Sequence, residues 1–346
     1  MNNSFDRFMK NALLASLGVI AVSALLIFSY MDSKDLSFQD VFQDGQFYFG
    51  NNDNDFNGFR LGSNLSSSFS NYDLLTLNED QTFEALDNIE INATLEEVIF
   101  IHDEREDIRV TFEREVPDTK AYTVDYETRT TNSQIIIDVD LKTNSFYADQ
   151  NYKGVITVYL PEDHELDHLT INRKIGSEDI VLPKYVKHLD VSVNFGSLKI
   201  INEYPLDSLR LSINAGDLYF KTTAPVEVIK ASVDTGEMNF DILSEIGELN
   251  ITTDIGEIYG FLEVSPKKVD VSCDLGDIEL EFDEPVNKLV SQLDLGDLSI
   301  NVSDDDESTV YVDTNLVDYD SHLDSTTNKS KANIFVEMNL GDVDIY

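Results

Sequence analysis

The sequence predicts an all-β protein, a single-stranded β-solenoid with about 20 residues per coil, preceded by one N-terminal transmembrane helix. Three observations predict this fold: a glycine that recurs every 20 residues, apolar residues spaced two apart on either side of it, and an uncharged apolar run near the N-terminus. A fixed period of this length is typical of a solenoid, because each repeat is one structural unit that buries its apolar face only against its neighbours.

Glycine sets the register of the repeat. Seven glycines stand 20 residues apart: Gly176, Gly196, Gly216, Gly236, Gly256, Gly276 and Gly296. An eighth copy, Gly341, follows after a longer gap. Glycine adopts a positive φ without a Cβ penalty, so the pattern [Asn/Asp]-x-Gly-[Asp/Glu] predicts a tight corner. We expect the Asn or Asp two residues before the glycine to accept a backbone hydrogen bond that closes this corner.

Apolar residues stand in columns at fixed distances from the glycines. In the copy around Gly216 the columns are occupied by Leu209, Leu211, Ile213 and Leu218, with mostly polar residues between them. A spacing of two is that of a strand with one buried and one solvated face. Each coil is therefore predicted to be a strand, a corner, a second strand and a polar return, which in several copies contains proline: Pro183, Pro205, Pro225 and Pro285.

The N-terminal region predicts a membrane anchor. Residues 11–31 carry no charge, and about 20 residues at a rise of about 1.5 Å span a hydrocarbon layer of about 30 Å. Arg7 and Lys10 precede the run and aspartates follow it, so residues 1–10 are predicted to be a short cytoplasmic tail, residues 11–31 a transmembrane signal anchor and the rest extracytoplasmic. A cleaved signal peptide is the main alternative, and a buried soluble helix is the third.

The remaining chain is predicted to contain a stalk and the solenoid. Residues 32–80 are rich in Asn, Asp, Ser, Gly and Phe, which favours a flexible acidic stalk over a sticky aromatic segment. Residues 81–168 are predicted to be irregular cap coils, residues 169–300 the regular repeats, and residues 301–346 interrupted terminal coils. Caps are expected because an end coil exposes unpaired strand edges. At the C-terminus we expect a loop, one glycine-free coil near 310–317 and a final strand pair that closes the end.

Charge and cysteine content restrict the function classes. The 346 residues include 66 acidic and 24 basic ones, for a net charge of −42. Such a surface repels the phosphates of nucleic acid and of anionic lipid, so no nucleic-acid partner is expected, whereas solubility and cation association are favoured. The one cysteine, Cys273, stands in an inward column, which predicts a packed small residue rather than a nucleophile or metal ligand.

The segment His164-Glu165-Leu166-Asp167-His168 matches the H-E-x-x-H signature of zinc peptidases. That chemistry requires a helix that presents both histidines on one face, and a third ligand downstream. The repeat register contradicts this reading, because Leu166 falls in the column of Leu206 and the following residues begin a strand. We therefore predict a return loop that runs into a strand.

Carboxylates form ladders beside the corner glycines. Unit charges about 4.8 Å apart repel by about 0.9 kcal/mol in water, so stacked aspartates need backbone donors, raised pKa values or bound cations. Turn capping with solvated neighbours is one interpretation, and weak Ca²⁺ binding between coils is the other, because hard oxygen ligands suit that ion. The speculative Ca²⁺ ladder consists of Asp234, Asp254, Asp274, Asp294, Asp277 and Asp297. No other cofactor and no catalytic residue is predicted.

Several stretches together carry a family resemblance. The opening NIEINATLEEVIFIHDEREDIRVTFE, the step GVITVYLPEDHELDHLTI and the tandem corners resemble the putative-adhesin, β-strand-repeat family of bacterial envelope proteins, over about residues 88–346. This is a domain of unknown function. The resemblance implies an extracytoplasmic, often membrane-tethered domain, linked in some relatives to envelope-stress systems. It supplies no catalytic residues.

These observations predict a membrane-anchored, extracytoplasmic β-solenoid that acts as a non-enzymatic, adhesin-like scaffold or binding module of the cell envelope. Its expected partner is an envelope protein or polysaccharide, with membrane contact through residues 11–31. Two alternatives are an accessory or sensor component of an envelope-stress signalling system and an enzyme that cleaves wall polymers. The ladders are too uniform to single out a catalytic group.

Overall fold

The structure, a computed structural model, describes residues 42–43, 46–47, 74–118, 122–131, 133–143, 154–176, 179–180, 182–302, 308–326 and 331–346. The chain divides into two units, of which the second comprises residues 56–59 and 71–346 and contains the solenoid. In the first unit, β1 (Phe42–Gln43) pairs antiparallel with β2 (Gln46–Phe47). Every element formed by the described residues is a β-strand.

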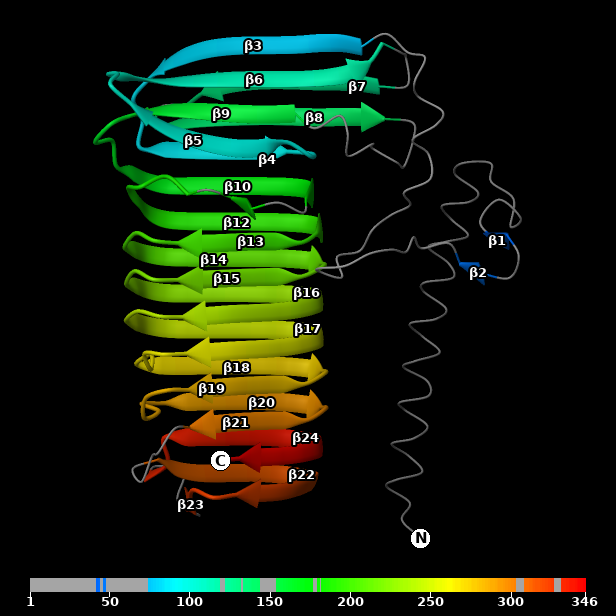
Figure 1. The fold of residues 1–346 in the computed structure, drawn as a ribbon, viewed down its shortest axis with the longest axis vertical. Helices are drawn as coiled ribbons and strands as arrows, with labels where there is room; N and C mark the ends of the chain where they lie inside the picture. Colours follow the sequence, from blue (N-terminus) through cyan, green and yellow to red (C-terminus); the bar gives the residue numbers. More distant parts are fainter. Residues whose placement is uncertain are drawn as a thin grey trace. The chain divides into compact units, whose positions relative to one another are not determined.

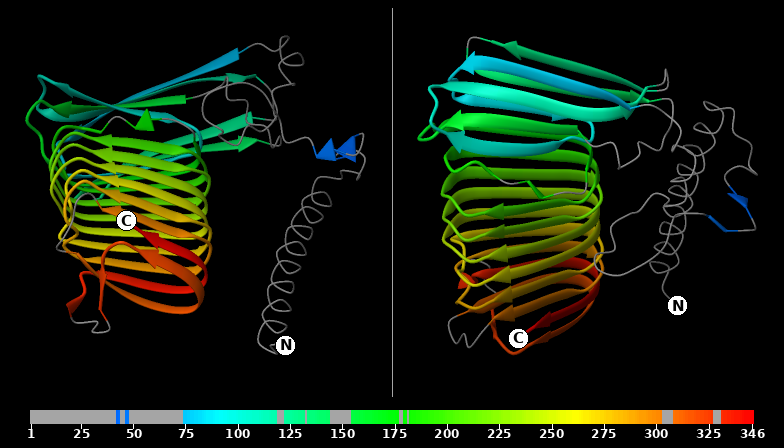
Figure 2. Two further views of the ribbon diagram at one scale, coloured as in Figure 1. Left: turned by 60° about the horizontal axis from the view of Figure 1, so that its bottom comes forward. Right: turned by 45° about the horizontal axis from the view of Figure 1, so that its top comes forward.

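The predicted all-β solenoid is confirmed, as the stacked bands of Figures 1 and 2 show. Each regular turn of the stack, here called a rung, contains a strand, a corner at the glycine and a strand on the next face. In two rungs a single strand continues through the corner. The regular strands are β10 (Leu166–Gly176), β11 (Asp179–Ile180), β12 (Val186–Gly196), β13 (Leu198–Asn202), β14 (Leu206–Ala215), β15 (Leu218–Thr222), β16 (Val226–Ile242), β17 (Ile246–Leu262), β18 (Lys268–Leu275), β19 (Ile278–Phe282), β20 (Leu289–Leu295) and β21 (Leu298–Val302).

Successive rungs pair in parallel with a shift of 20 residues. Leu189 lies opposite Leu209, Leu209 opposite Ile229, and Leu218 opposite Met238. All of these side chains are buried, as the predicted columns require. A shift of one residue would turn every inward side chain toward solvent, so the apolar columns and the strand register support each other.

The corner glycines have the predicted geometry. Seven of them, including Gly341, have φ between 120° and 149°. A Cβ placed on Gly256 would lie 1.7 Å from the carbonyl oxygen of Gly236, so successive corners are too close for any other residue. Gly176 is different, because a Cβ there would instead lie 2.8 Å from Cζ of Arg173. This glycine makes room for a buried side chain.

At the N-terminal end the chain passes outward and then returns. The strands are β3 (Leu74–Glu84), β4 (Asn88–Ala93), β5 (Glu97–Asp103), β6 (Asp107–Pro117), β7 (Tyr122–Thr130), β8 (Gln134–Thr143) and β9 (Gly154–Pro161). On one face the spatial order is β10, β4, β8, β7, and on the other it is β5, β9, β6, β3. Strand β8 therefore lies between β4 and the antiparallel outer strand β7, and β9 lies between β5 and the antiparallel strand β6. Strand β3 begins at Leu74, within the range assigned to the stalk.

The C-terminal end repeats this out-and-back path. After β21 the chain forms β22 (Thr309–Ser321) and β23 (Asp324–Ser325), and then returns as β24 (Ile334–Ile345). Strand β24 pairs with β20 and β21 on one side and with β22 on the other. Strand β22 contains no glycine and lies where the glycine-free coil near 310–317 is predicted. The expectation that the last strand pair closes the end is wrong, because β22 lies outside β24 (Figure 1).

A group of buried charges interrupts the apolar core near the N-terminal end. Glu96, Arg114 and Arg173 are exposed by only 0%, 2% and 4%. Glu96 pairs with Arg114 and accepts hydrogen bonds from the backbone N–H groups of Thr94 (2.7 Å) and Leu95 (2.9 Å). Burial lowers the pKa values of both guanidinium groups, and the Glu96 carboxylate partly offsets this. The copy around Gly176 thus contains a charged residue in a column that is mostly apolar in the other rungs.

No helix in the described part of the chain is long and apolar enough to cross a membrane. The predicted anchor, residues 11–31, lies outside the described residues, as do the predicted tail and most of the predicted stalk.

Candidate binding surfaces

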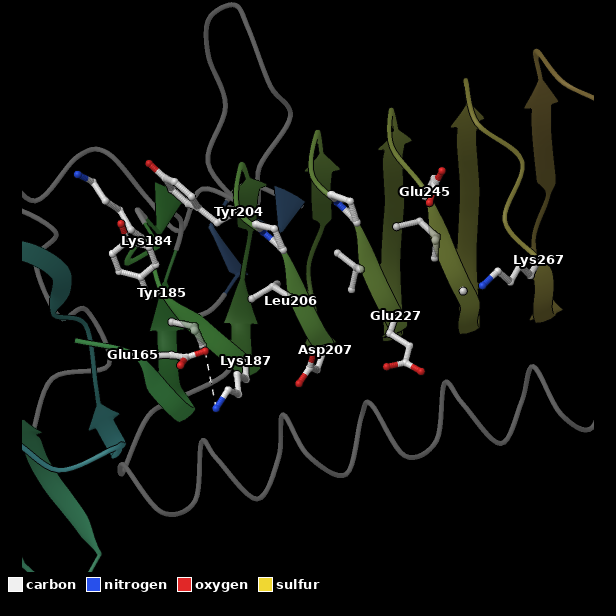
Figure 3. A pocket seen from close by; sticks show the side chains of 16 residues that line it. Glu165, Lys184, Tyr185, Lys187, Tyr204, Leu206, Asp207, Glu227, Glu245 and Lys267 are labelled. Atoms are coloured by element: carbon white, nitrogen blue, oxygen red, sulfur yellow. Dashed lines mark ion pairs between the residues drawn. The ribbon is translucent and has the colours of Figure 1, made fainter. Parts of the chain in front are cut away.

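A shallow groove of about 700 Å³ runs across the corner at which each rung returns to the next, and we call it the return-corner groove (Figure 3). Its floor consists of the buried side chains that begin the longer strands, namely Val186, Leu206, Val226 and Ile246. Because these side chains come from four consecutive rungs, the groove follows the axis of the stack rather than the direction of a strand. Such a shape suits a linear ligand.

The backbone of the return segments holds the groove in place. Pro205 and Pro225 lie directly before their strands, where a fixed φ near −65° and a missing N–H group are tolerated. The N–H of Leu206 donates to the carbonyl oxygen of Pro225 (3.1 Å), and that of Leu166 donates to Tyr185 (2.8 Å). Ladder hydrogen bonds therefore continue through the return corner and make its surface rigid.

Aromatic and charged side chains form the two rims of the groove. Tyr185 is 44% exposed and meets the ring of His102 edge-on, with the ring centroids 5.9 Å apart; Tyr204 lies beside it in Figure 3. Lys187 contacts the carboxylate of Glu165 at 3.7 Å. The other charged side chains are two lysines, Lys184 and Lys267, and three carboxylates, Asp207, Glu227 and Glu245. Donors, acceptors and exposed rings at one surface are suited to binding a polar ligand.

The H-E-x-x-H segment has no helical geometry, as predicted. His164 and Glu165 precede β10, and His168 lies within that strand. The Nε2 atom of His164 lies 3.1 Å from the carbonyl oxygen of Leu86, and the ring of His168 stacks on that of His188 with the centroids 4.5 Å apart. The two histidines of the motif thus have separate surroundings.

A small polar pocket of about 370 Å³ adjoins the groove and shares two of its residues. It is lined by Asp87, Asn88, Asp163, His164, Glu165, Asp167 and Lys187. Across the described ranges, no three His, Cys, Asp or Glu side chains are arranged as a metal site. The pocket therefore gives the zinc-peptidase reading no support.

The ladder aspartates lie where the repeat predicts them, on neighbouring rungs and exposed to solvent. The backbone hydrogen bonds at the corner, however, involve the residue after the glycine. The carboxylate of Asp277 accepts the N–H of Asp297 (2.8 Å), and that of Asp297 accepts the N–H of Asp342 (3.1 Å). The carboxylate of Asp217 likewise accepts the N–H of Glu237 (3.3 Å), and burial raises the pKa of Asp217. These bonds connect rungs, and Ca²⁺ binding by the ladder stays a prediction.

Cys273 is a packed core residue, as expected. It is 2% exposed, and its Sγ atom lies 3.5 Å from the carbonyl oxygen of Gly256. Burial raises the pKa of the thiol to about 11. A thiol that stays protonated is a poor nucleophile and a poor metal ligand.

Sequence reasoning missed the return-corner groove. It treated the returns as polar connectors, although the repeat carries a signal there. Tyr185, Pro205 and Pro225 stand 20 residues apart at the position that directly precedes the inward column. A bulky or ring-containing residue at one fixed position of a repeat marks a continuous surface feature.

Comparison with known proteins agrees with this architecture. Residues 86–345 match the Toastrack DUF4097 family. No curated protein matches the sequence.

Solved structures resemble the chain at low sequence identity. One, a putative adhesin from Parabacteroides merdae ATCC 43184, is 8% identical with a TM-score of 0.45, and the match covers 78% of this chain and 96% of that one. A putative adhesin from Parabacteroides distasonis ATCC 8503 is 8% identical with a TM-score of 0.46, and the match covers 79% and 97%. A putative lipid binding protein from the same strain is 10% identical with a TM-score of 0.31, and the match covers 78% and 96%. The family match extends from just before β4 to the end of β24, and the chain belongs to the Toastrack DUF4097 family.

Proposed function

We propose that this protein is a membrane-anchored, extracytoplasmic, non-enzymatic binding scaffold of the bacterial cell envelope. The observation that carries the proposal is the return-corner groove, which extends over successive rungs held in one register. A rigid stack with such a groove displays one continuous binding face. The apolar run at residues 11–31, with basic residues before it and acidic residues after it, supports the membrane anchor and its orientation.

The groove chemistry favours a linear envelope polysaccharide as the ligand. The rings of Tyr185 and Tyr204 provide apolar faces on which sugar rings stack, while their hydroxyl groups remain available for hydrogen bonds. Lysines and carboxylates along the rims supply donors and acceptors for sugar hydroxyl groups. An envelope protein is the other candidate partner, and it would use the same face.

Co-sedimentation with purified, insoluble cell-wall polysaccharide tests the proposal. The full-length chain in mild detergent is expected to pellet with the polymer, and the double variant Tyr185→Ala/Tyr204→Ala is expected to lose at least about tenfold in affinity. Tyr259→Ala on another face of the stack is the matched control. Equal pelleting of wild type and groove variant would refute the assigned surface, and release of soluble fragments from the polymer would show an enzyme.

Protease protection tests the localisation. In intact spheroplasts, externally added protease is expected to digest the solenoid while residues 1–10 stay protected. Protection of the solenoid until the membrane is opened would refute the proposed orientation.

A further inference from the structure

A second surface, on the glycine corners, carries a line of mostly apolar side chains that are exposed or half-buried. The residue before each corner glycine points outward, and successive rungs place these residues side by side in the register Ile175, Phe195, Ala215, Thr235, Ile255, Leu275, Leu295 and Leu340. We call this line the corner ridge. Phe195, Leu275 and Ile255 are exposed by 61%, 48% and 43%. Single exposed apolar residues are common, but an aligned series indicates an interaction surface.

Carboxylates flank the corner ridge on both sides along the chain. Between residues 234 and 297, every rung has an acidic residue directly before the ridge residue and another directly after the glycine. These acidic rails are Asp234, Asp254, Asp274 and Asp294 on one side and Glu237, Glu257, Asp277 and Asp297 on the other. All eight are exposed, and no ion pair within the described ranges includes any of them.

The second rail is held in a fixed orientation. Asn239 donates to the carboxylate of Glu237 (2.6 Å), and Tyr259 donates to that of Glu257. The backbone N–H of Asp297 occupies one oxygen of Asp277, which leaves the other oxygen available. The negative groups are thus positioned before any partner arrives, and this preorganisation favours binding.

We propose that the corner ridge binds a basic amphipathic α-helix of another protein, which lies along the axis of the solenoid. Rungs repeat about every 4.8 Å and an α-helix rises about 5.4 Å per turn, so one helical turn corresponds to one rung, with a mismatch of about 2 Å over four rungs. Apolar residues at i, i+4, i+7 and i+11 would cover Thr235, Ile255, Leu275 and Leu295. Lysine and arginine residues beside that stripe would meet the two acidic rails.

Other occupants fit this surface less well. An extended strand along the axis presents same-face residues about 6.8 Å apart, which loses register with the rungs after two residues. An anionic membrane surface and a second copy of the ridge are repelled by the rails. The ridge is a different surface from the return-corner groove, so this inference does not depend on the proposed polysaccharide ligand.

A peptide titration tests the proposal. The probe is a fluorescent peptide of about 14 leucine and lysine residues, about 21 Å long as a helix, with leucine at i, i+4, i+7 and i+11. A second peptide of the same composition places its leucines two residues apart, alternating with lysines, and therefore favours a strand. The full-length chain in mild nonionic detergent is expected to bind the helical peptide at least about tenfold more tightly than the alternating one, with an increase in peptide helicity.

Variants assign the binding to the ridge and the rails. Ile255→Ser/Leu275→Ser is expected to weaken binding about tenfold, and Asp274→Asn/Asp277→Asn to weaken it about fivefold with a shallower salt dependence. Glu279→Gln/Glu281→Gln removes the same charge from exposed positions of the same rung and is the matched control. A control effect equal to the rail effect would show unspecific attraction and overturn the proposal, and so would equal binding of the two peptides. Unchanged binding by Tyr185→Ala/Tyr204→Ala separates this surface from the groove.

Discussion

Replacing Arg173 with methionine is expected to stabilise the protein, which is the opposite of the usual effect of a core substitution. Arg173 is almost completely buried, and its Nε–H group has no hydrogen-bond partner within the described ranges. It occupies the column that contains Val193 and Ile213 in the following rungs. The nearby Glu96 carboxylate already receives Arg114 and two backbone N–H groups. Among the described residues, Arg173 therefore brings a buried charge without a hydrogen-bonded counter-ion.

The two matched substitutions Arg173→Met and Arg114→Met are expected to change the free energy of unfolding in opposite directions. An unpaired buried charge carries a desolvation cost of several kcal/mol, so we expect Arg173→Met to raise the free energy of unfolding by about 1–2 kcal/mol. Arg114→Met removes the ion-pair partner of the buried Glu96 carboxylate, and such a loss lowers stability by about 3–5 kcal/mol. Because the Arg173 guanidinium group still attracts the Glu96 carboxylate in this variant, we expect the loss of stability at the lower end of this range, about 3 kcal/mol.

Urea unfolding followed by far-UV circular dichroism measures both changes. Hydrogen exchange of the amides in β4 and β10 adds a local measurement, because rungs at one end of a repeat protein open separately from the rest. If Arg173→Met lowers stability by more than about 1 kcal/mol at an unchanged m-value, the guanidinium group has a stabilising partner and the reasoning fails.

Four further outcomes are expected. Gly256→Ala should lower the free energy of unfolding by more than about 3 kcal/mol, because strain from its positive φ adds to a clash with the backbone of Gly236. Gly176→Ala should lower it less, because the nearest atoms belong to the flexible end of the Arg173 side chain. Equal losses in urea melts would contradict this. Elemental analysis should find no stoichiometric zinc, and zinc that disappears in His164→Ala would restore the peptidase reading. Millimolar Ca²⁺ should raise the melting temperature of the wild type more than ionic-strength-matched Na⁺ does, and Asp274→Asn should reduce the difference; equal melts would refute the cation ladder. Cys273 should react with a maleimide slowly at about pH 8 in the folded protein and rapidly in urea; its folded pKa of about 11 exceeds the unfolded value of 9.0, so its stabilising contribution is complete below pH 9 and is lost as the pH rises through about 11.

The regular part of the fold is readable from sequence because every local signal agrees there. The positions of Leu209, Leu211 and Ile213 have strand periodicity, and Gly216 marks the corner that ends that run. Repetition every 20 residues then fixes the parallel register without any long-range reasoning. Local structure and tertiary pairing follow from one pattern.

The end topology has no comparable signal. The alternation of Thr309–Ser321 and of Ile334–Ile345 predicts strands, and Gly341 marks the second segment as a further copy of the repeat, but no residue marks where the first segment lies relative to it. Their spatial order depends on which open edge each strand meets, and this is a property of the assembled stack. The N-terminal insertion of β8 and β9 is hidden for the same reason.

The candidate surfaces were only partly predictable. The acidic rails are visible in the sequence as columns, but the exposure of Phe195 and Leu275 is not. A strict alternation of inward and outward residues would place both side chains in the core, and the corner breaks this alternation. The sequence pattern predicts the corner hydrogen bonds at the Asn or Asp two residues before the glycine. They form instead at Asp277 and Asp297, because the side chain after the glycine reaches the backbone of the next rung.

The out-and-back path at both ends limits how this protein can change in length. A 20-residue unit can be gained or lost only between about residues 186 and 302, where sequence order and spatial order coincide. Removing β24 would take away an internal layer and leave a gap between β21 and β22. During synthesis, too, β22 has no neighbour on the side of β21 until β24 has been made. Length variation among related chains should therefore be confined to the middle, with both ends kept constant.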